Sequence, residues 1–144
     1  FNVCGGCDDE KYLKILKEAE ENGYIKYHGQ QKDIIPFLKQ ASCIVHPSYY
    51  PEGMSNVLLE AAASGRPIIA TDRSGCRETL NDGVTGYIVP IKDLDSLVKA
   101  IEKILSMSVE ERRNMGLAGR KKMEEEFDRN IVVEAYLREI RKGN

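Results

Sequence analysis

Two glutamates, Glu52 and Glu60, stand eight positions apart in the most informative segment of this 144-residue sequence. Glu52 precedes an expected helix, and Glu60 falls more than one turn inside it. A carboxylate accepts two hydrogen bonds from a vicinal diol, so Glu60 suits a ribose and Glu52 suits the hydroxyls of a further sugar. Spacing alone favours a simpler interpretation, in which both are solvated surface charges.

The segment between the glutamates has the composition of an anion-binding turn. Gly53 allows a ligand to approach the backbone, and Ser55 or Asn56 can cap a helix whose first N–H groups lack internal partners. Such N–H groups suit a phosphate, and the helix dipole adds about 0.3–1 kcal/mol per favourable surface charge. The small residues 61–65 should let this helix lie close on a sheet.

The surrounding sequence alternates short strand-like runs with longer helical patterns. Strands are expected at 1–4, 25–28, 43–47, 67–71 and 86–89. Helices are expected at 8–22, 33–41, 55–64, briefly after Gly75, and at 93–105, 109–126 and 129–141. This order predicts an α/β fold: a doubly wound parallel sheet with extra C-terminal helices, forming one domain over residues 1–144. Ligands of such sheets bind at the carboxyl ends of the strands.

The helix expected at 93–105 carries an apolar stripe that should cover the sheet. Its members are Leu94, Leu97, Val98, Ile101 and Leu105. The pattern at 109–126 is rich in both acidic and basic residues and is most simply a solvated face. The last helix carries apolar residues that need a partner, so self-association is a possibility.

Composition excludes several classes of protein. The formal net charge of −2 gives no global positive field for nucleic acid. No apolar run approaches the roughly 20 residues that span a bilayer, and no signal peptide is recognisable, so a cytoplasmic protein is expected. Four scattered cysteines are too few for a disulfide framework.

Cysteine chemistry supplies the main alternative function. Cys4 and Cys7 form a C-x-x-C pair between a strand and a helix start, where a thiol redox module would need a lowered thiol pKa. A zinc site could be assembled from Cys4, Cys7, His28 and His46, but no second paired ligand motif at zinc spacing supports it. We expect no metal.

A series of spaced motifs runs through the chain in a fixed order. They are Pro47-Ser48, Glu52-Gly53, Leu59-Glu60-Ala61, Gly65-Arg66-Pro67, Gly75, Glu78 and Asp82-Gly83-Val84-Thr85-Gly86. Together they resemble the group 1 retaining glycosyltransferases of the GT-B fold, over essentially the whole chain. The nearest similarity is to bacterial enzymes that build capsule, O-antigen or other surface polysaccharides.

The resemblance implies a role for each residue of the segment. Glu52 would be the key catalytic residue, contacting hydroxyls of the donor sugar, and Glu60 would hold the nucleotide ribose. Backbone groups of Gly53, Met54, Ser55, Asn56 and Val57 would line the sugar and the diphosphate. Gly29 and Gln31 would lie beside the base of the nucleotide-sugar donor. We expect this donor to be a UDP-sugar. Transfer to an acceptor hydroxyl would retain the anomeric configuration and need no metal or other cofactor.

The resemblance also implies that this is the C-terminal, donor-binding half of a longer enzyme. The first strand–helix unit, with its diphosphate-binding Arg and Lys, and the N-terminal acceptor domain would be absent. The chain alone should then be inactive, because the missing domain would bind a glycan or lipid-linked acceptor. The intact enzyme could be peripheral to a membrane. A sugar-nucleotide epimerase of the same fold is a further alternative.

Overall fold

A computed structural model describes residues 1–50 and 53–142. The chain forms two compact units, Phe1–Gln40 and the residues from Ala41 onward. Each unit is described below by itself. The key glutamate of the sequence prediction, Glu52, lies outside the described residues.

The first unit contains two short parallel strands and two helices. Its elements are β1 (Asn2–Val3), α1 (Glu10–Glu21), β2 (Lys26–Tyr27) and α2 (Ile35–Gln40). Asn2 pairs with Lys26 in the parallel ladder. The side chain of Asp9 caps α1 by accepting a hydrogen bond from the N–H of Lys11 at 2.8 Å, and Gly23 follows the helix with a φ of 76°. The predicted helix is therefore confirmed, with both ends within two residues.

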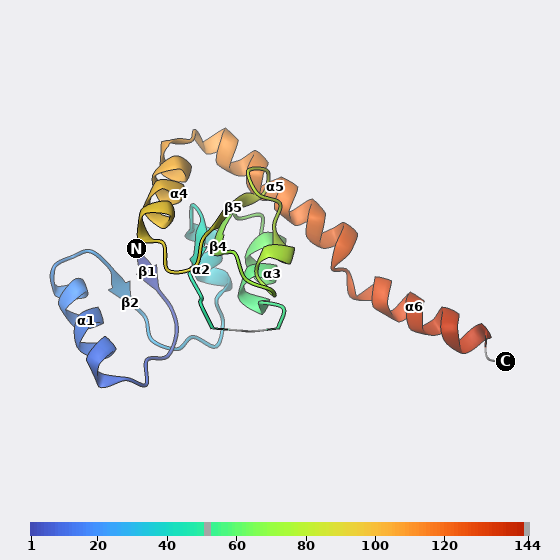
Figure 1. Cartoon of the computed structure of the whole chain (residues 1–144), viewed down its shortest axis with the longest axis horizontal. Coiled ribbons are helices and arrows are strands. Elements are labelled where there is room, and N and C mark those ends of the chain that lie inside the picture. The colour runs from blue at the N-terminus through green and yellow to red at the C-terminus, as the bar shows by residue number, and fades with distance from the viewer. Residues whose placement is uncertain (51–52, 143–144) are drawn as a thin grey trace. The chain divides into compact units, whose positions relative to one another are not determined.

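The second unit contains a three-stranded parallel sheet in the order β3-β4-β5. Its elements are β3 (Ile44–His46), α3 (Asn56–Ala63), β4 (Ile68–Thr71), the 3-10 helix η1 (Arg77–Thr79), β5 (Gly86–Val89), α4 (Leu94–Ser106), α5 (Val109–Glu126) and α6 (Arg129–Lys142). Helices α3 and α4 lie on opposite sides of this sheet (Figure 1). The predicted elements and the doubly wound parallel arrangement are confirmed.

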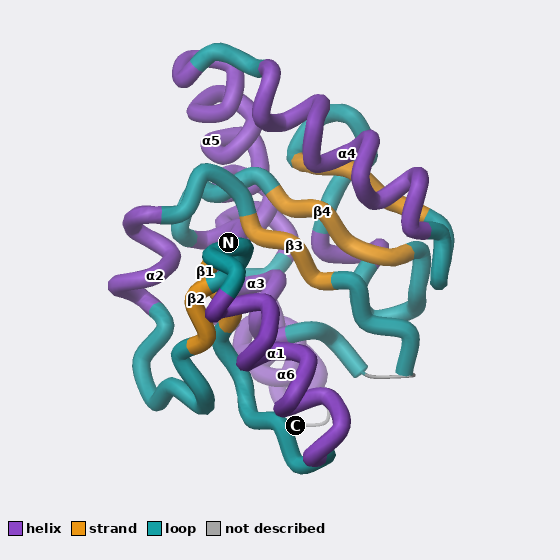
Figure 2. The backbone as a smooth tube through the Cα atoms, turned by 90° about the vertical axis from the view of Figure 1, so that its left-hand side faces the viewer, coloured by secondary structure: helices purple, strands orange, loops and turns teal. Residues whose placement is uncertain are grey.

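The central strand β4 is the most buried part of the second unit. All four of its residues are at most 2% exposed. Ile69 packs with Ala100 and Ile104 of α4 and with Val89 of β5. Because side chains alternate along a strand, Ile68 and Ala70 point to the other face, where α3 lies (Figure 2). This strand therefore anchors both layers of the fold.

Helix α4 covers the sheet with a face different from the predicted stripe. Leu97 and Ile101 pack against the core as expected, but Leu94 is 70% exposed and Leu105 is 58% exposed. Ala100 and Ile104 occupy the centre of the buried face instead. The prediction overlooked them because it gave most weight to large side chains, whereas the small Ala100 allows the helix to approach the sheet closely.

Helix α5 is not simply a solvated face, because it packs closely on α3. Gly116 is buried, and a Cβ added to it would lie 2.0 Å from the carbonyl oxygen of Gly65. Gly119 faces Ala62 across the same contact. The small residues after Glu60 were predicted to let α3 lie close on the sheet, and the structure shows that they also allow close packing on two glycines of α5.

Helix α6 contributes nothing to the buried core. None of its residues, 129–142, all of which the structure describes, is buried. Across the described chain, no helix has the length and apolar character required to cross a membrane.

Candidate functional site

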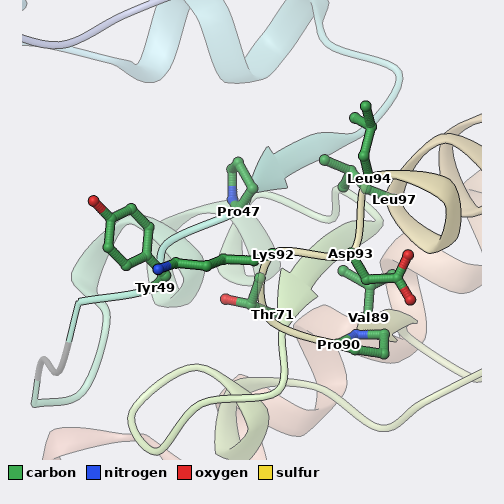
Figure 3. Close-up of a pocket in the computed structure, with 9 residues that line it drawn as sticks. All are labelled: Pro47, Tyr49, Thr71, Val89, Pro90, Lys92, Asp93, Leu94 and Leu97. Carbon is green, nitrogen blue, oxygen red and sulfur yellow. The ribbon is translucent and has the colours of Figure 1, made fainter.

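The carboxyl ends of β3, β4 and β5 surround a cavity of about 200 Å³ (Figure 3). Thr71 and Val89 are the last residues of β4 and β5, and Pro47 directly follows β3. The cavity is lined by Pro47, Tyr49, Thr71, Val89, Pro90, Lys92, Asp93, Leu94 and Leu97. It lies at the edge of the sheet where the sequence predicts a ligand.

The loop after β3 is tied to the neighbouring strand and to a lysine. The Thr71 hydroxyl donates a hydrogen bond to the carbonyl of Ser48. The ring of Tyr49 stacks on Tyr50 with centroids 4.3 Å apart, and the Nζ atom of Lys92 lies 4.6 Å from the Tyr49 centroid. Tyr49 therefore lines the cavity with a cation beside its ring, a contact that the sequence did not reveal.

The turn from β5 into α4 places one cation and one anion at the cavity. Lys92 has a φ of 59°, a left-handed conformation that is unusual for a residue with a side chain. Asp93 caps α4: its carboxylate accepts hydrogen bonds from the N–H of Ser96 at 3.0 Å and from the Ser96 hydroxyl at 2.7 Å. These bonds hold the pKa of Asp93 below its usual value.

Helix α3 begins at the same edge of the sheet, and Ser55 holds its N-cap position. Ser55 is 2% exposed, yet its side chain makes no capping hydrogen bond with any residue in the described ranges. Its Oγ atom instead lies 3.4 Å from Nε2 of His46, the last residue of β3. Its backbone N–H donates to the carbonyl of Gly75 at 3.0 Å, so the Gly75 loop also borders this helix start.

The other predicted residues of this segment are accessible to a ligand. Gly53, Met54, Asn56 and Val57 are exposed at the entry to α3, and Glu60 is exposed on the helix itself. The side chain of Ser55 is the exception, because it is buried against His46. The structure does not describe Glu52, so its role stays a prediction.

The predicted base contacts belong to the first unit. Gly29 follows β2 with a φ of 63°, and its carbonyl accepts a hydrogen bond from the N–H of Gly5 at 2.8 Å. The side-chain amide of Gln31 donates to the carbonyl of His28. Gly29 and Gln31 therefore lie in an ordered turn that joins the ends of β1 and β2, the expected edge for a ligand in this unit.

Nothing in the first unit favours cysteine or zinc chemistry. Desolvation raises the pKa of the Cys4 thiol, whereas a redox-active thiol needs a lowered pKa. The Cys7 Sγ atom contacts the carbonyl oxygen of Asp9 at 3.4 Å, and both cysteines are free. His28 pairs with Asn2 at 2.8 Å and stacks edge-on against Phe37. Within the described residues, no three potential ligand side chains are grouped to hold a metal.

The motif at residues 82–86 has a structural role. Its aspartate, Asp82, accepts a hydrogen bond from the N–H of Ile88 at 2.8 Å. Thr85 is 2% exposed, and its hydroxyl accepts from the N–H of Asn81 at 2.8 Å. These bonds shape the turn that leads into β5 and so position the strand whose end borders the cavity.

A parallel sheet covered on both faces, with loops gathered at its carboxyl edge, defines a Rossmann-like α/β fold. Comparison with known proteins then identifies its kind: residues 1–122 match the family described as "Glycosyl transferases group 1". The chain belongs to this family. Its fold is the Rossmann-like half of a GT-B glycosyltransferase, as the sequence predicts.

Similar proteins include several bacterial polysaccharide enzymes. The chain is 30% identical to the lipopolysaccharide core biosynthesis glycosyltransferase LpsE of Rhizobium meliloti, over 92% of this chain and 38% of LpsE. It is 34% identical to the capsular polysaccharide biosynthesis glycosyltransferase CapM of Staphylococcus aureus, over 88% of this chain and 32% of CapM.

Among solved structures, HepE of Anabaena in complex with UDP superposes with a TM-score of 0.83 at 19% identity. The superposition covers 99% of this chain and 40% of HepE, and at this identity it shows the shared fold. The chain thus spans about two fifths or less of the length of each of these three proteins.

Proposed function

We propose that this chain binds a nucleoside diphosphate sugar, specifically a UDP-sugar, as the donor half of a retaining hexosyltransferase in polysaccharide biosynthesis. The observation that carries the proposal is the start of α3 at the carboxyl edge of the sheet, where the Ser55 side chain makes no capping bond to any residue that the structure describes. The first N–H groups of a helix carry partial positive charge, so they suit a diphosphate. Family membership and the named polysaccharide relatives support the same role.

In this proposal, each part of the donor has its own binding residues in the chain. The exposed carboxylate of Glu60 binds the ribose hydroxyls, and backbone groups from Gly53 to Val57 line the diphosphate and the sugar. Glu52 binds hydroxyls of the transferred sugar and is the catalytic residue of this proposal. Gly29 and Gln31 of the first unit border the base. Each assignment matches hydrogen-bond acceptors or donors to the complementary groups of the donor.

The reaction proceeds by exchange of one C–O bond for another. The acceptor oxygen forms a bond to the anomeric carbon on the face from which the diphosphate departs, and the acceptor proton passes to the leaving phosphate. Preorganised N–H groups at the start of α3 stabilise the charge that develops on that phosphate. Positioning of two substrates supplies the remaining catalysis, and the proposal requires no metal.

The acceptor is a glycan or a lipid-linked saccharide, held by parts of the enzyme beyond this chain. This chain aligns with part of LpsE and part of CapM, and both relatives are named for polysaccharide synthesis. Their names support a glycan or lipid-linked saccharide as the acceptor. We place the enzyme in the cytoplasm, peripheral to the membrane when the acceptor is lipid-linked. Alone, the chain should bind the donor weakly and transfer no sugar.

Isothermal titration with UDP, UDP-glucose, GDP and GDP-mannose tests the proposal. We expect weak but saturable binding of the uridine ligands and weaker binding of the guanosine ligands, because base selection depends on the turn at Gly29 and Gln31. A parallel assay of sugar release should show no transfer. Failure to bind any of the four ligands would overturn the proposed donor role, and rapid transfer by the chain alone would overturn its assignment as half of an active site.

A further inference from the structure

His46 and Ser55 form a pair at the start of α3 that the donor site does not by itself require. Ser55 Oγ lies 3.4 Å from Nε2 of His46, and the serine is almost fully buried at 2% exposure. The serine backbone is held by a second contact, because its N–H donates a hydrogen bond to the carbonyl of Gly75. The hydroxyl is therefore held within a packed site at the end of β3.

This orientation is unusual for serine at an N-cap. Such a serine normally accepts a hydrogen bond from the backbone N–H two or three residues further along, here Val57 or Leu58. Ser55 has the extended backbone of an N-cap, with φ −75° and ψ 106°, but it makes no capping bond within the described residues. The backbone geometry for capping is present, so the side-chain rotation accounts for the missing bond.

We infer that His46 is a positioning residue: it holds the Ser55 hydroxyl away from α3 and so keeps the Val57 and Leu58 N–H groups available to the donor diphosphate. This inference rests on the proposed donor function for its consequence, but the orientation of Ser55 is a property of the protein alone. If His46 loses its polar ring, the hydroxyl is released to rotate and cap the helix. It then competes with the phosphate for the same N–H groups.

A double-mutant cycle separates this role from ordinary packing. The four proteins are the unaltered chain, His46→Leu, Ser55→Ala and His46→Leu with Ser55→Ala. With Ser55 present, His46→Leu should weaken UDP binding by roughly 3- to 10-fold, the size expected for one competing capping bond. With alanine at position 55, the same change at His46 should have little effect, because no hydroxyl remains to form a cap. His46→Gln, which keeps a polar group at this position, should bind UDP like the unaltered chain.

Amide hydrogen exchange of Val57 and Leu58 provides a readout that needs no ligand. Exchange of one of these amides should slow in His46→Leu, and this slowing should disappear in the double variant. The inference would be overturned if His46→Leu weakened UDP binding equally with Ser55 and with alanine at position 55. His46 would then act through packing or through direct contact with UDP. Unchanged exchange in His46→Leu would also overturn it. If the predicted exchange pattern appears but no protein binds UDP, the positioning of Ser55 stands and the donor function fails.

Discussion

The two units of the chain bury their strands to very different degrees. In the second unit every residue of β4 is at most 2% exposed, and helices cover both faces of the sheet. Among residues 1–40, all of which the structure describes, Leu38 alone is buried. A packed sheet edge therefore positions the α3 site, whereas the turn at Gly29 and Gln31 depends on local hydrogen bonds.

Truncation of one strand residue in each unit gives the largest expected contrast. Ile69→Ala in β4 removes a fully buried side chain and should lower the free energy of unfolding by about 2–5 kcal/mol. Val3→Ala in β1 removes a side chain that is only half-buried and should cost about 1 kcal/mol or less. Urea denaturation followed by circular dichroism measures both. Equal losses would contradict the proposed difference between the units.

The contact between α5 and the end of α3 supplies a sharper test with a matched control. Gly116→Ala would place a Cβ 2.0 Å from the Gly65 carbonyl oxygen, so the helices must separate, at a cost of about 1–3 kcal/mol. Gly119→Ala lies on the same helix, but its Cβ would meet no atom closer than 3.7 Å. Thermal unfolding should therefore show a large loss of stability for the first variant and little for the second. A similar loss for both would contradict the decisive role of the close contact, because alanine has the higher helix propensity at both positions.

The smallest predicted effect concerns the acid stability of the start of α4. Hydrogen bonds from Ser96 lower the pKa of Asp93 in the folded chain. The stabilisation that ionised Asp93 gives to the folded chain is therefore present in full above the unfolded pKa of about 3.9. The contribution is lost as the pH falls through the lower folded value. In Asp93→Asn, the free energy of unfolding should therefore fall less steeply as the pH decreases through this range. Asp95→Asn, on the same turn, is the control and should keep the steeper fall. An acid limb that is unchanged in Asp93→Asn would contradict the capping role.

Sequence patterns predicted the order of the elements because short β-branched runs and helical periods are local signals. The ends of α1 are set by Asp9 and Gly23, which act on the residues next to them, so a local pattern could predict this helix. Strands β1 and β2 were predicted to be four residues long but contain two residues each, since pairing rather than local composition sets their length. Local sequence patterns thus predicted the order of the helices and strands better than the lengths of the strands.

Contacts between distant residues could not be read from spacing. The close approach of Gly116 to Gly65, where an added Cβ would lie 2.0 Å from the carbonyl oxygen, depends on how α5 crosses α3. The charged residues of α5 gave no sign of this buried face. The sequence placed Ser55 at the helix start correctly, but it gave no sign that His46 would engage the hydroxyl. The cavity contact between Lys92 and Tyr49 likewise depends on the turn after β5. Tertiary geometry decided each of these features.

In the proposed donor complex, the exposed carboxylate of Glu60 binds the ribose. The most direct measurement compares UDP with 2′,3′-dideoxy-UDP as ligands of the unaltered chain, Glu60→Gln and the control Glu110→Gln. Glu60→Gln should weaken UDP binding by roughly 10- to 100-fold, the value of a charge-assisted pair of hydrogen bonds, and should not alter the weak binding of the dideoxy ligand. Glu110→Gln should change neither affinity. If Glu60→Gln lost equal affinity for both ligands, or lost no affinity for UDP, the proposed role of Glu60 would be contradicted.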